Sequence, residues 1–289
     1  MIALFFVVRS AAVFIDGAAD TAQALGVSPL IIGVTIVGFG TSAPEILISI
    51  FAALQGNPGL AVGNAIGSNI ANIALILGAT ACLYTLFLSQ HIVRRELPLL
   101  VLVQLLLIGL VYDADLSRVD GIILLLGLVA VMGRTVLQGI KASSSDEAIQ
   151  TQGSTVDTRR ALIKLLLGLG VLLASSRALV WGAVDIASAL GVSDLVIGLT
   201  VVAIGTSLPE LAACIASARI RAFEIAIGNI IGSNVFNSLA VVGISGVIHP
   251  AALPPDVWAR DLPIALGLAV LLLVLSVRRA GKAAQLGRI

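Results

Sequence analysis

The stretch Gly40-Thr41-Ser42-Ala43-Pro44-Glu45 returns 165 positions later as Gly205-Thr206-Ser207-Leu208-Pro209-Glu210. Both copies lie in apolar surroundings, where a carboxylate is costly. From residue 17 to residue 78 the chain aligns without a gap with residues 182–243, and about half of the positions are identical. The chain therefore contains a long internal repeat.

A second polar block follows the first in each copy. It reads Gly63-Asn64-Ala65-Ile66-Gly67-Ser68-Asn69-Ile70-Ala71-Asn72, and again Gly228-Asn229-Ile230-Ile231-Gly232-Ser233-Asn234-Val235-Phe236-Asn237. Two copies of two polar motifs in a membrane protein predict one ion site with pseudo-symmetry.

The composition is that of a membrane protein. Of the 289 residues, 58% are hydrophobic and 11% are charged, and the mean hydropathy is +1.10. The runs 97–111 and 262–277 are continuously apolar, which fits helices and not the alternating strands of an outer-membrane barrel. We expect an all-α polytopic membrane protein, with its first apolar run kept as a helix of the mature chain. A formal net charge of +1 argues against nucleic-acid binding.

Charges, prolines and glycines divide the chain into about nine expected spans. They cover residues 2–25, 29–54, 60–87, 96–112, 119–139, 161–188, 194–217, 223–247 and 260–277. Arg95-Glu96-Leu97-Pro98 matches Arg260-Asp261-Leu262-Pro263 at the same offset, whereas the fifth span has no counterpart. We expect two five-helix repeats, residues 1–140 and 161–289, with the last helix of the second repeat missing.

The basic residues predict the orientation. With the N-terminus outside, the inner loops and tail hold Arg94, Arg95, Lys141, Arg159, Arg160, Arg219, Arg221, Arg278, Arg279, Lys282 and Arg288, whereas the outer loops hold only Arg118 and Arg260. The polar linker, residues 141–160, and the C-terminus are then cytoplasmic. Five spans precede the linker, so the second repeat enters from the opposite side and the repeats are inverted.

The first motif has the chemistry of a hard-cation site. Pro44 and Pro209 break or kink their helices, which frees carbonyl groups of the preceding turn, and Thr41, Ser42, Thr206 and Ser207 add hydroxyl oxygens. Glu45 and Glu210 complete an all-oxygen set whose charge balances one Ca²⁺. A lone Thr-Ser pair usually bonds back to its own helix, but two buried glutamates at equivalent positions favour a functional site.

The second motif combines packing with polar side chains. Its glycines have the spacing used for close helix contact, and in the first copy Asn64, Ser68 and Asn72 share one helix face. We interpret Ser68, Asn72, Ser233 and Asn237 as ligands or their supports, and Asn64, Asn69, Asn229 and Asn234 as partners of the broken backbone. Asp20 and Asp185 lie near span ends and are expected at the interface, and Arg9 and Arg177 are expected to snorkel.

These motifs resemble the calcium/cation antiporter superfamily, and within it the sodium/calcium exchanger branch, over nearly the whole chain. The resemblance implies ten helices in two inverted halves, with the first and sixth helices sliding across a central cation site. It carries the metal ligands onto Glu45, Glu210, Thr41, Thr206, Ser42, Ser207, Ser68, Ser233, Asn72 and Asn237, with the carbonyls of Gly38 and Ala203. Proton-coupled relatives generally carry Asn where this chain has Thr-Ser, and many prokaryotic relatives carry Asp at one of the positions of Asn72 and Asn237.

The expected function is secondary active antiport of Ca²⁺ against Na⁺ by alternating access in the cell (inner) membrane. The expected partners are these ions and the lipid bilayer, with no obligatory protein partner, no cofactor and no enzymatic activity. Three alternatives stay open: a proton-coupled divalent-cation exchanger, an intramembrane hydrolase that uses the paired carboxylates, and a non-transporting fragment.

Overall fold

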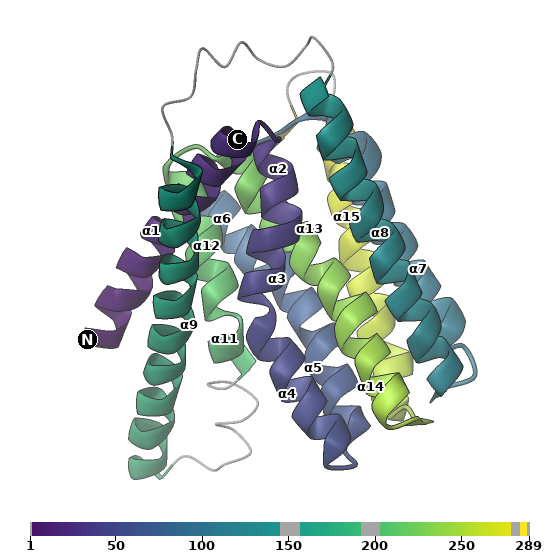
Figure 1. Ribbon diagram of the computed structural model, residues 1–289. Coiled ribbons are helices and arrows are strands. Elements are labelled where there is room, and N and C mark those ends of the chain that lie inside the picture. The colour runs from purple at the N-terminus through teal and green to yellow at the C-terminus, as the bar shows by residue number, and fades with distance from the viewer. Residues whose placement is uncertain (1, 145–156, 192–202, 279–283, 288–289) are drawn as a thin grey trace.

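The computed structural model describes residues 2–144, 157–191, 203–278 and 284–287. The first half consists of α1 (Ile2–Leu25), α2 (Pro29–Ile32), α3 (Gly38–Thr41), α4 (Ala43–Leu54), α5 (Pro58–Ala71), α6 (Gly78–Leu83), α7 (Leu97–Leu110) and α8 (Arg118–Ser144). The second half consists of α9 (Thr158–Ala189), α11 (Ala203–Thr206), α12 (Leu208–Arg219), α13 (Phe223–Phe236), α14 (Val242–Ile248) and α15 (Leu262–Arg278). The described chain is thus a bundle of helices (Figure 1), which confirms the expected helical class.

Short π-helical turns interrupt several of these helices. They are η1 (Gly33–Val37), η2 (Asn72–Leu77), η3 (Ile92–Glu96), η5 (Asn237–Val241) and η6 (Val257–Asp261). The starts of η2 and η5, and of η3 and η6, are separated by the same offset as the sequence motifs. The repeat in the sequence is therefore also a repeat of local backbone geometry.

Six described helical segments are long and apolar enough to cross a membrane, and a seventh is a bent pair. The bent pair is Pro29–Thr41 with Ala43–Leu54, whose axes differ by 46° at Ser42. Pro44 lies in the first turn of α4, where its missing N–H is tolerated, so the helix restarts there as the sequence predicts. The expected total of nine spans stays a prediction.

Two expected boundaries differ from the structure. The third span ends at Leu83 and not at residue 87, because Leu86–Leu88 forms strand β1. The expected linker is helical at both described ends, since α8 continues to Ser144 and α9 begins at Thr158; residues 145–156 lie outside the described part.

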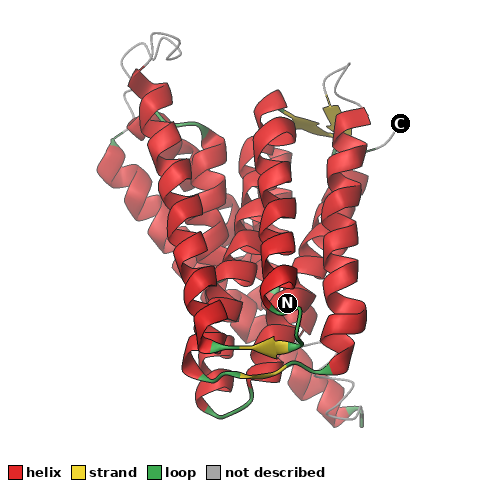
Figure 2. Cartoon of the chain, turned by 90° about the vertical axis from the view of Figure 1, so that its right-hand side faces the viewer, coloured by secondary structure: helices red, strands yellow, loops and turns green. Residues whose placement is uncertain are grey.

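Among the described residues, four short strands join the two halves at the ends of the bundle. Strand β1 (Leu86–Leu88) pairs antiparallel with β4 (Ala284–Leu286), and β2 (Asp115–Leu116) pairs antiparallel with β3 (Ala251–Ala252). Strands β1 and β3 follow corresponding helices in the two halves, yet the two pairs lie at opposite ends of the bundle (Figure 2). Each pair contains one strand from each half.

The core of the bundle is built around α13. Every residue of this helix from Ile225 to Phe236 is buried. It packs against α2, η1 and α3 through glycines: a Cβ on Gly38 would lie 3.0 Å from the Gly232 Cα, and one on Gly232 would collide with the Val34 carbonyl oxygen. Gly232 therefore allows two backbones to meet at the broken helix. Residues 195–199, the repeat counterparts of residues 30–34, lie outside the described part.

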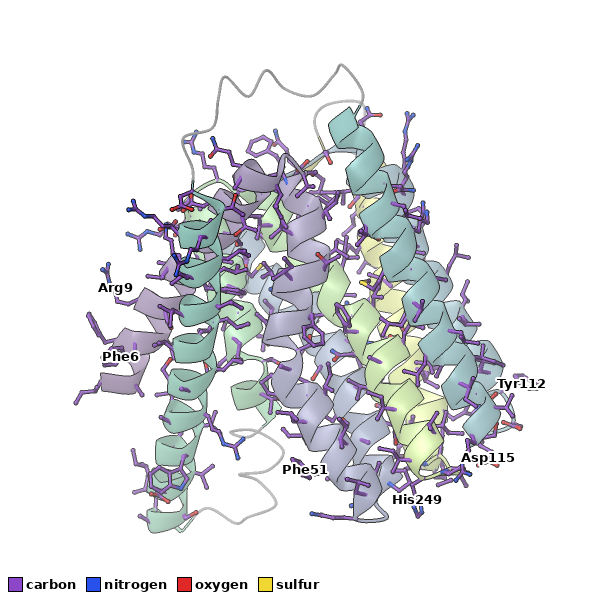
Figure 3. All side chains as sticks on the ribbon, viewed as in Figure 1. Phe6, Arg9, Phe51, Tyr112, Asp115 and His249 are labelled. Atoms are coloured by element: carbon purple, nitrogen blue, oxygen red, sulfur yellow. The ribbon has the colours of Figure 1, made fainter. Side chains whose placement is uncertain are left out.

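Helices α1 and α9 form a second close pair beside this core. A Cβ on Gly17 would lie 2.5 Å from the Leu165 backbone nitrogen, and one on Gly168 would lie 2.5 Å from the Phe14 backbone nitrogen. Phe6 and Arg9 on α1 point away from the bundle in Figure 3. Arg9 and Arg177 are both exposed, which agrees with snorkelling side chains.

Candidate functional site

The two motif carboxylates come from short helices that begin just after the breaks. Glu45 lies in the first turn of α4 and Glu210 in the first turn of α12, each one residue after its proline. Their side chains are 0% and 1% exposed, respectively. The two carboxylates are near enough to repel each other when both are charged. A site that buries both therefore favours a bound cation.

Ser42 links the two halves at this point. Its hydroxyl donates to Glu210 Oε1 at 3.3 Å, so a residue at the break of the first half contacts the carboxylate of the second. Ser207 is the repeat counterpart of Ser42 and is 3% exposed, but its hydroxyl has no hydrogen-bond partner among the described residues. The pseudo-symmetric residues are both buried at the breaks, although only one makes the contact across the halves.

Thr41, Ser233 and Gly38 form the next layer of oxygen atoms. The Thr41 hydroxyl oxygen lies 3.4 Å from the Ser233 hydroxyl oxygen, and Ser233 donates to the Gly38 carbonyl at 3.4 Å. The expectation of an unpaired carbonyl near Gly38 is wrong, because this carbonyl also accepts the Ser42 N–H at 3.2 Å. The α-helical turn α3 closes this hydrogen bond before the break.

Asn64 and Asn229 support the carboxylate-bearing turns, as the sequence predicts. Asn64 Nδ2 donates to the Glu45 carbonyl at 3.3 Å, and Asn229 Nδ2 donates to the Glu210 carbonyl at 3.3 Å. These bonds tie each restarted helix to the helix that carries the second motif of the same half. Asn229 Oδ1 also accepts from Thr41 at 2.9 Å.

The other two asparagines do not contact the broken backbone, which corrects our interpretation of them. Asn69 Nδ2 donates to the Ser238 hydroxyl at 2.8 Å, and Asn234 Oδ1 accepts from Asn72 Nδ2 at 3.1 Å. Both bonds join the two halves.

Half of the buried side-chain oxygen atoms without a partner in the described part of the chain belong to the predicted ligand set. Among the described side chains they include both carboxylate oxygens of Glu45, Oε2 of Glu210, Oγ of Ser207, and Oδ1 of Asn72 and of Asn237. Buried polar atoms are almost always hydrogen-bonded, because an unpaired one loses its hydration without compensation. A cation coordinated by these oxygens would satisfy several of them together.

The structure describes the surroundings of some of the remaining expected ligands but not of all. Ser68 is 6% exposed on α5, and Thr206 is half-buried at the end of α11. Ala203 begins α11, and its side-chain environment lies outside the described part. No group of three or more His, Cys, Asp or Glu side chains occurs among the described residues, so any metal held there relies on neutral oxygens beside the two glutamates.

Charged residues near the span ends have separate partners. Lys164 Nζ lies 3.0 Å from Asp20 Oδ2 and 3.7 Å from Asp16 Oδ2. All three side chains are more than a third exposed. Asp20 thus belongs to an exposed ion-pair cluster between α1 and α9, as expected for an interfacial residue, and not to the buried site.

Our sequence reasoning missed three polar residues that the structure places near the site. Ser49 accepts from Asn64 Nδ2 at 3.2 Å, and Gln104 Nε2 and Asn69 Nδ2 both donate to Ser238. A signal for Gln104 was present: it is the only polar side chain in the run 97–111. Ser238 directly follows Asn237 but occurs in only one copy of the repeat.

Comparisons with known proteins agree with one another. The model of the family described as "Sodium/calcium exchanger protein" matches residues 1–136 and 160–284. The inner membrane protein YrbG of Escherichia coli (strain K12) is 39% identical over 97% of this chain and 88% of its own length. The sodium/calcium exchanger MaX1 of Methanosarcina acetivorans is 28% identical over 95% of this chain and 89% of its own length.

Solved structures show the same fold. A structure of the sodium-calcium exchanger NCX_Mj superimposes with a TM-score of 0.84 at 30% sequence identity, covering 99% of this chain and 90% of that one. These similar proteins are exchangers or membrane proteins by name, and none is named as an enzyme. The hydrolase alternative is therefore dropped.

Proposed function

The chain belongs to the sodium/calcium exchanger family of integral membrane proteins, and we propose that it is a secondary active antiporter that exchanges Ca²⁺ for Na⁺ by alternating access. The proposal rests above all on the unpaired buried oxygens of Glu45 and Glu210. Two carboxylates carry the charge that one Ca²⁺ or two Na⁺ ions neutralise, so either set can occupy a site that is costly when empty. Ca²⁺ and Na⁺ are the transported substrates, and the proposal needs no resident cofactor.

Each proposed ligand has a role that follows from its place. Glu45 and Glu210 supply charge, and the hydroxyls of Thr41, Ser42, Thr206, Ser207, Ser68 and Ser233 supply neutral oxygens. The amide oxygens of Asn72 and Asn237 and the carbonyls of Gly38 and Ala203 complete the set; at the Gly38 carbonyl the ion would replace the bond from Ser233. Because the donors are hard oxygens in excess of what one small ion needs, the site suits Ca²⁺, which takes six to eight oxygen ligands at about 2.3–2.6 Å.

The arrangement of the halves supports alternating access. The equivalent strands β1 and β3 at opposite ends of the bundle are what inverted repeats would give. Helices α1 and α9 pack on each other through Gly17 and Gly168 as a pair beside the core. Movement of this pair relative to the core would open the buried carboxylates to one side at a time.

The proposed orientation places the linker and the C-terminus in the cytoplasm and the N-terminus outside. The end of α8, the start of α9 and the end of α15 lie at the same end of the bundle in Figure 1, whereas Tyr112, Asp115 and His249 lie at the other end in Figure 3. The linker end is the one with most basic residues, which fits the cell membrane and the positive-inside rule.

Competition between the two ions tests the site directly. In calorimetric titrations of the purified protein in detergent, Na⁺ should weaken the apparent affinity for Ca²⁺, whereas the same concentration of choline should not. A proton-coupled exchanger would instead show Ca²⁺ affinity that depends on pH but is the same in Na⁺ and choline. The absence of any Ca²⁺ binding would contradict both and favour a non-transporting chain.

A further inference from the structure

The repeat predicts two equivalent asparagine pairs between the halves, but the structure contains only one. Asn72 and Asn234 are joined at 3.1 Å. Their repeat counterparts are Asn237 and Asn69, and this second pair does not form: Asn237 Nδ2 and Asn69 Oδ1, the two atoms that would make it, are both without a partner, and Asn69 Nδ2 donates to Ser238 at 2.8 Å. The pseudo-symmetry of the site is therefore broken at the pair that contains Asn237.

Two polar residues near this pair, Gln104 of the first half and Ser238 of the second, have no polar counterpart in the other half. Ser238 accepts from Asn69 Nδ2 and, at 3.2 Å, from Gln104 Nε2. The repeat counterpart of Ser238 is Ile73, and that of Gln104 is Ala269, so nothing equivalent is available to hold Asn234. Gln104 lies on α7, Asn69 on α5 and Ser238 on η5, and their exposures are 1%, 1% and 0%, respectively.

The consequence appears at Asn237. Its side chain is 0% exposed, and neither Oδ1 nor Nδ2 has a hydrogen-bond partner in the described structure. Asn72, in contrast, uses its Nδ2 on Asn234 and leaves only Oδ1 without a partner. Of the two equivalent amides, Asn237 is thus the one with no competing bond.

We propose that Gln104 and Ser238 are positioning residues that fix the Asn69 amide by its Nδ2, so that Asn69 Oδ1 does not accept from Asn237 Nδ2 and the Asn237 side chain stays free to turn towards the transported cation. The inference rests on the proposed exchange function and adds that the equivalent asparagines of the two halves have different roles. Asn72 is a ligand tied to the opposite half, whereas Asn237 is the free ligand whose amide can turn towards the ion. Loss of either Gln104 or Ser238 would let the Asn69 amide turn, so that its Oδ1 accepts from Asn237 Nδ2 as Asn234 Oδ1 accepts from Asn72 Nδ2.

The test is a rescue experiment on Ca²⁺ affinity. We expect Gln104→Met and Ser238→Ala each to weaken the apparent affinity for Ca²⁺ about three- to tenfold, because one hydrogen bond from Asn237 Nδ2 to Asn69 would have to break before the Asn237 amide could turn to the ion, with the maximal exchange rate little changed. Asn69→Ala alone should leave affinity unchanged, since Asn69 is not a ligand. Asn69→Ala combined with Gln104→Met should restore the parental affinity, because no Asn69 oxygen is left to accept from Asn237 Nδ2.

The matched control for Ser238→Ala is Ser245→Ala. Ser245 lies on α14, and its hydroxyl is also fully buried but has no hydrogen-bond partner among the described residues. It should not alter affinity. A merely structural network would make the double variant weaker than either single one, which would overturn the proposal. Unchanged affinity in both Gln104→Met and Ser238→Ala would also overturn the proposal. So would a loss of folded protein in both variants, if adding Asn69→Ala did not restore folding. Absence of Ca²⁺ exchange in the parent protein would instead count against the proposed function itself.

Discussion

The hydroxyl of Ser42 lies 3.3 Å from Glu210 Oε1, although the two residues are 168 positions apart in the chain. Ser42 occupies the break before α4, and Glu210 lies in the first turn of α12. One half therefore contacts the carboxylate of the other at the point where both helices restart. This relationship makes the proposed cation site a property of the two repeats together, so changes in either half should affect the same ion.

Neutralising either carboxylate should abolish exchange. Glu45→Gln and Glu210→Gln each remove half of the formal countercharge in a site where water offers little compensation. The folded protein should still reach the membrane, because an amide matches the carboxylate in size. Ion flux in liposomes and size-exclusion profiles would measure the two effects.

The matched control is Glu224→Gln. Glu224 is half-buried in the first turn of α13 and accepts a bond from Ser28 at 3.2 Å, outside the ligand set. This variant should retain exchange. Near-parental Ca²⁺ flux in Glu45→Gln or Glu210→Gln would remove that residue from the proposed site.

Gly232→Ala should destabilise the protein. Its new Cβ would collide with the carbonyl oxygen of Val34, so the backbones at the broken helix would have to separate. Overpacking of this kind costs about 1–3 kcal/mol of unfolding free energy. Gly267→Ala on α15 is the control, because its Cβ would have no described atom within 4 Å. Thermal unfolding in detergent should show a lower midpoint for Gly232→Ala only, and equal midpoints would argue against the close approach.

Asn237→Asp should give a folded exchanger with a steeper dependence on pH. A third carboxylate beside Glu45 and Glu210 favours protonation of one of them, since like charges repel strongly at low dielectric. Sodium-driven Ca²⁺ flux should then fall more steeply on acidification than in the parent. A well-folded variant with an unchanged pH profile would show that Asn237 does not face the ion.

Asn72→Asp provides the comparison in the other half. It removes the Nδ2 group that donates to Asn234 at 3.1 Å and places carboxylate oxygens against Asn234 Oδ1. We expect this variant to lose stability, as judged by its thermal midpoint, more than Asn237→Asp does. Equal behaviour of the two variants would contradict the asymmetry between the paired asparagines.

Cysteine labelling should place the linker in the cytoplasm. In a background with Cys82→Ala and Cys214→Ala, Ser144→Cys should react with a membrane-impermeant reagent only after permeabilisation. Asp115→Cys, at the opposite end of the bundle, should react in intact cells. The reverse pattern would invert the proposed topology.

Local features of the site were predictable from the sequence. Pro44 indicated the break at Ser42, and the position of Glu45 after it indicated a buried carboxylate, because these effects depend on a few neighbouring residues. The support of Glu45 by Asn64 also followed from the recurring motif.

Contacts between the halves could not be predicted in the same way. The partners of Asn69 and Asn234 depend on how the two repeats meet. The two asparagines are not equivalent, because the second repeat has Ser238 where the first has Ile73. The strand Leu86–Leu88 was assigned to a helix because its apolar residues continue the preceding run, whereas its partner Ala284–Leu286 is remote in sequence. Gln104 carried a signal of its own as a lone amide in an apolar run.

Calcium uptake into proteoliposomes tests the central claim most directly. Vesicles loaded with Na⁺ are diluted into medium that contains Ca²⁺ with choline in place of Na⁺, and radioactive calcium is counted inside. The account predicts rapid uptake that requires internal Na⁺, is abolished by Glu45→Gln and does not occur with a pH gradient alone. Uptake that is equal with internal choline, or that a pH gradient drives without Na⁺, would contradict sodium–calcium exchange by this protein.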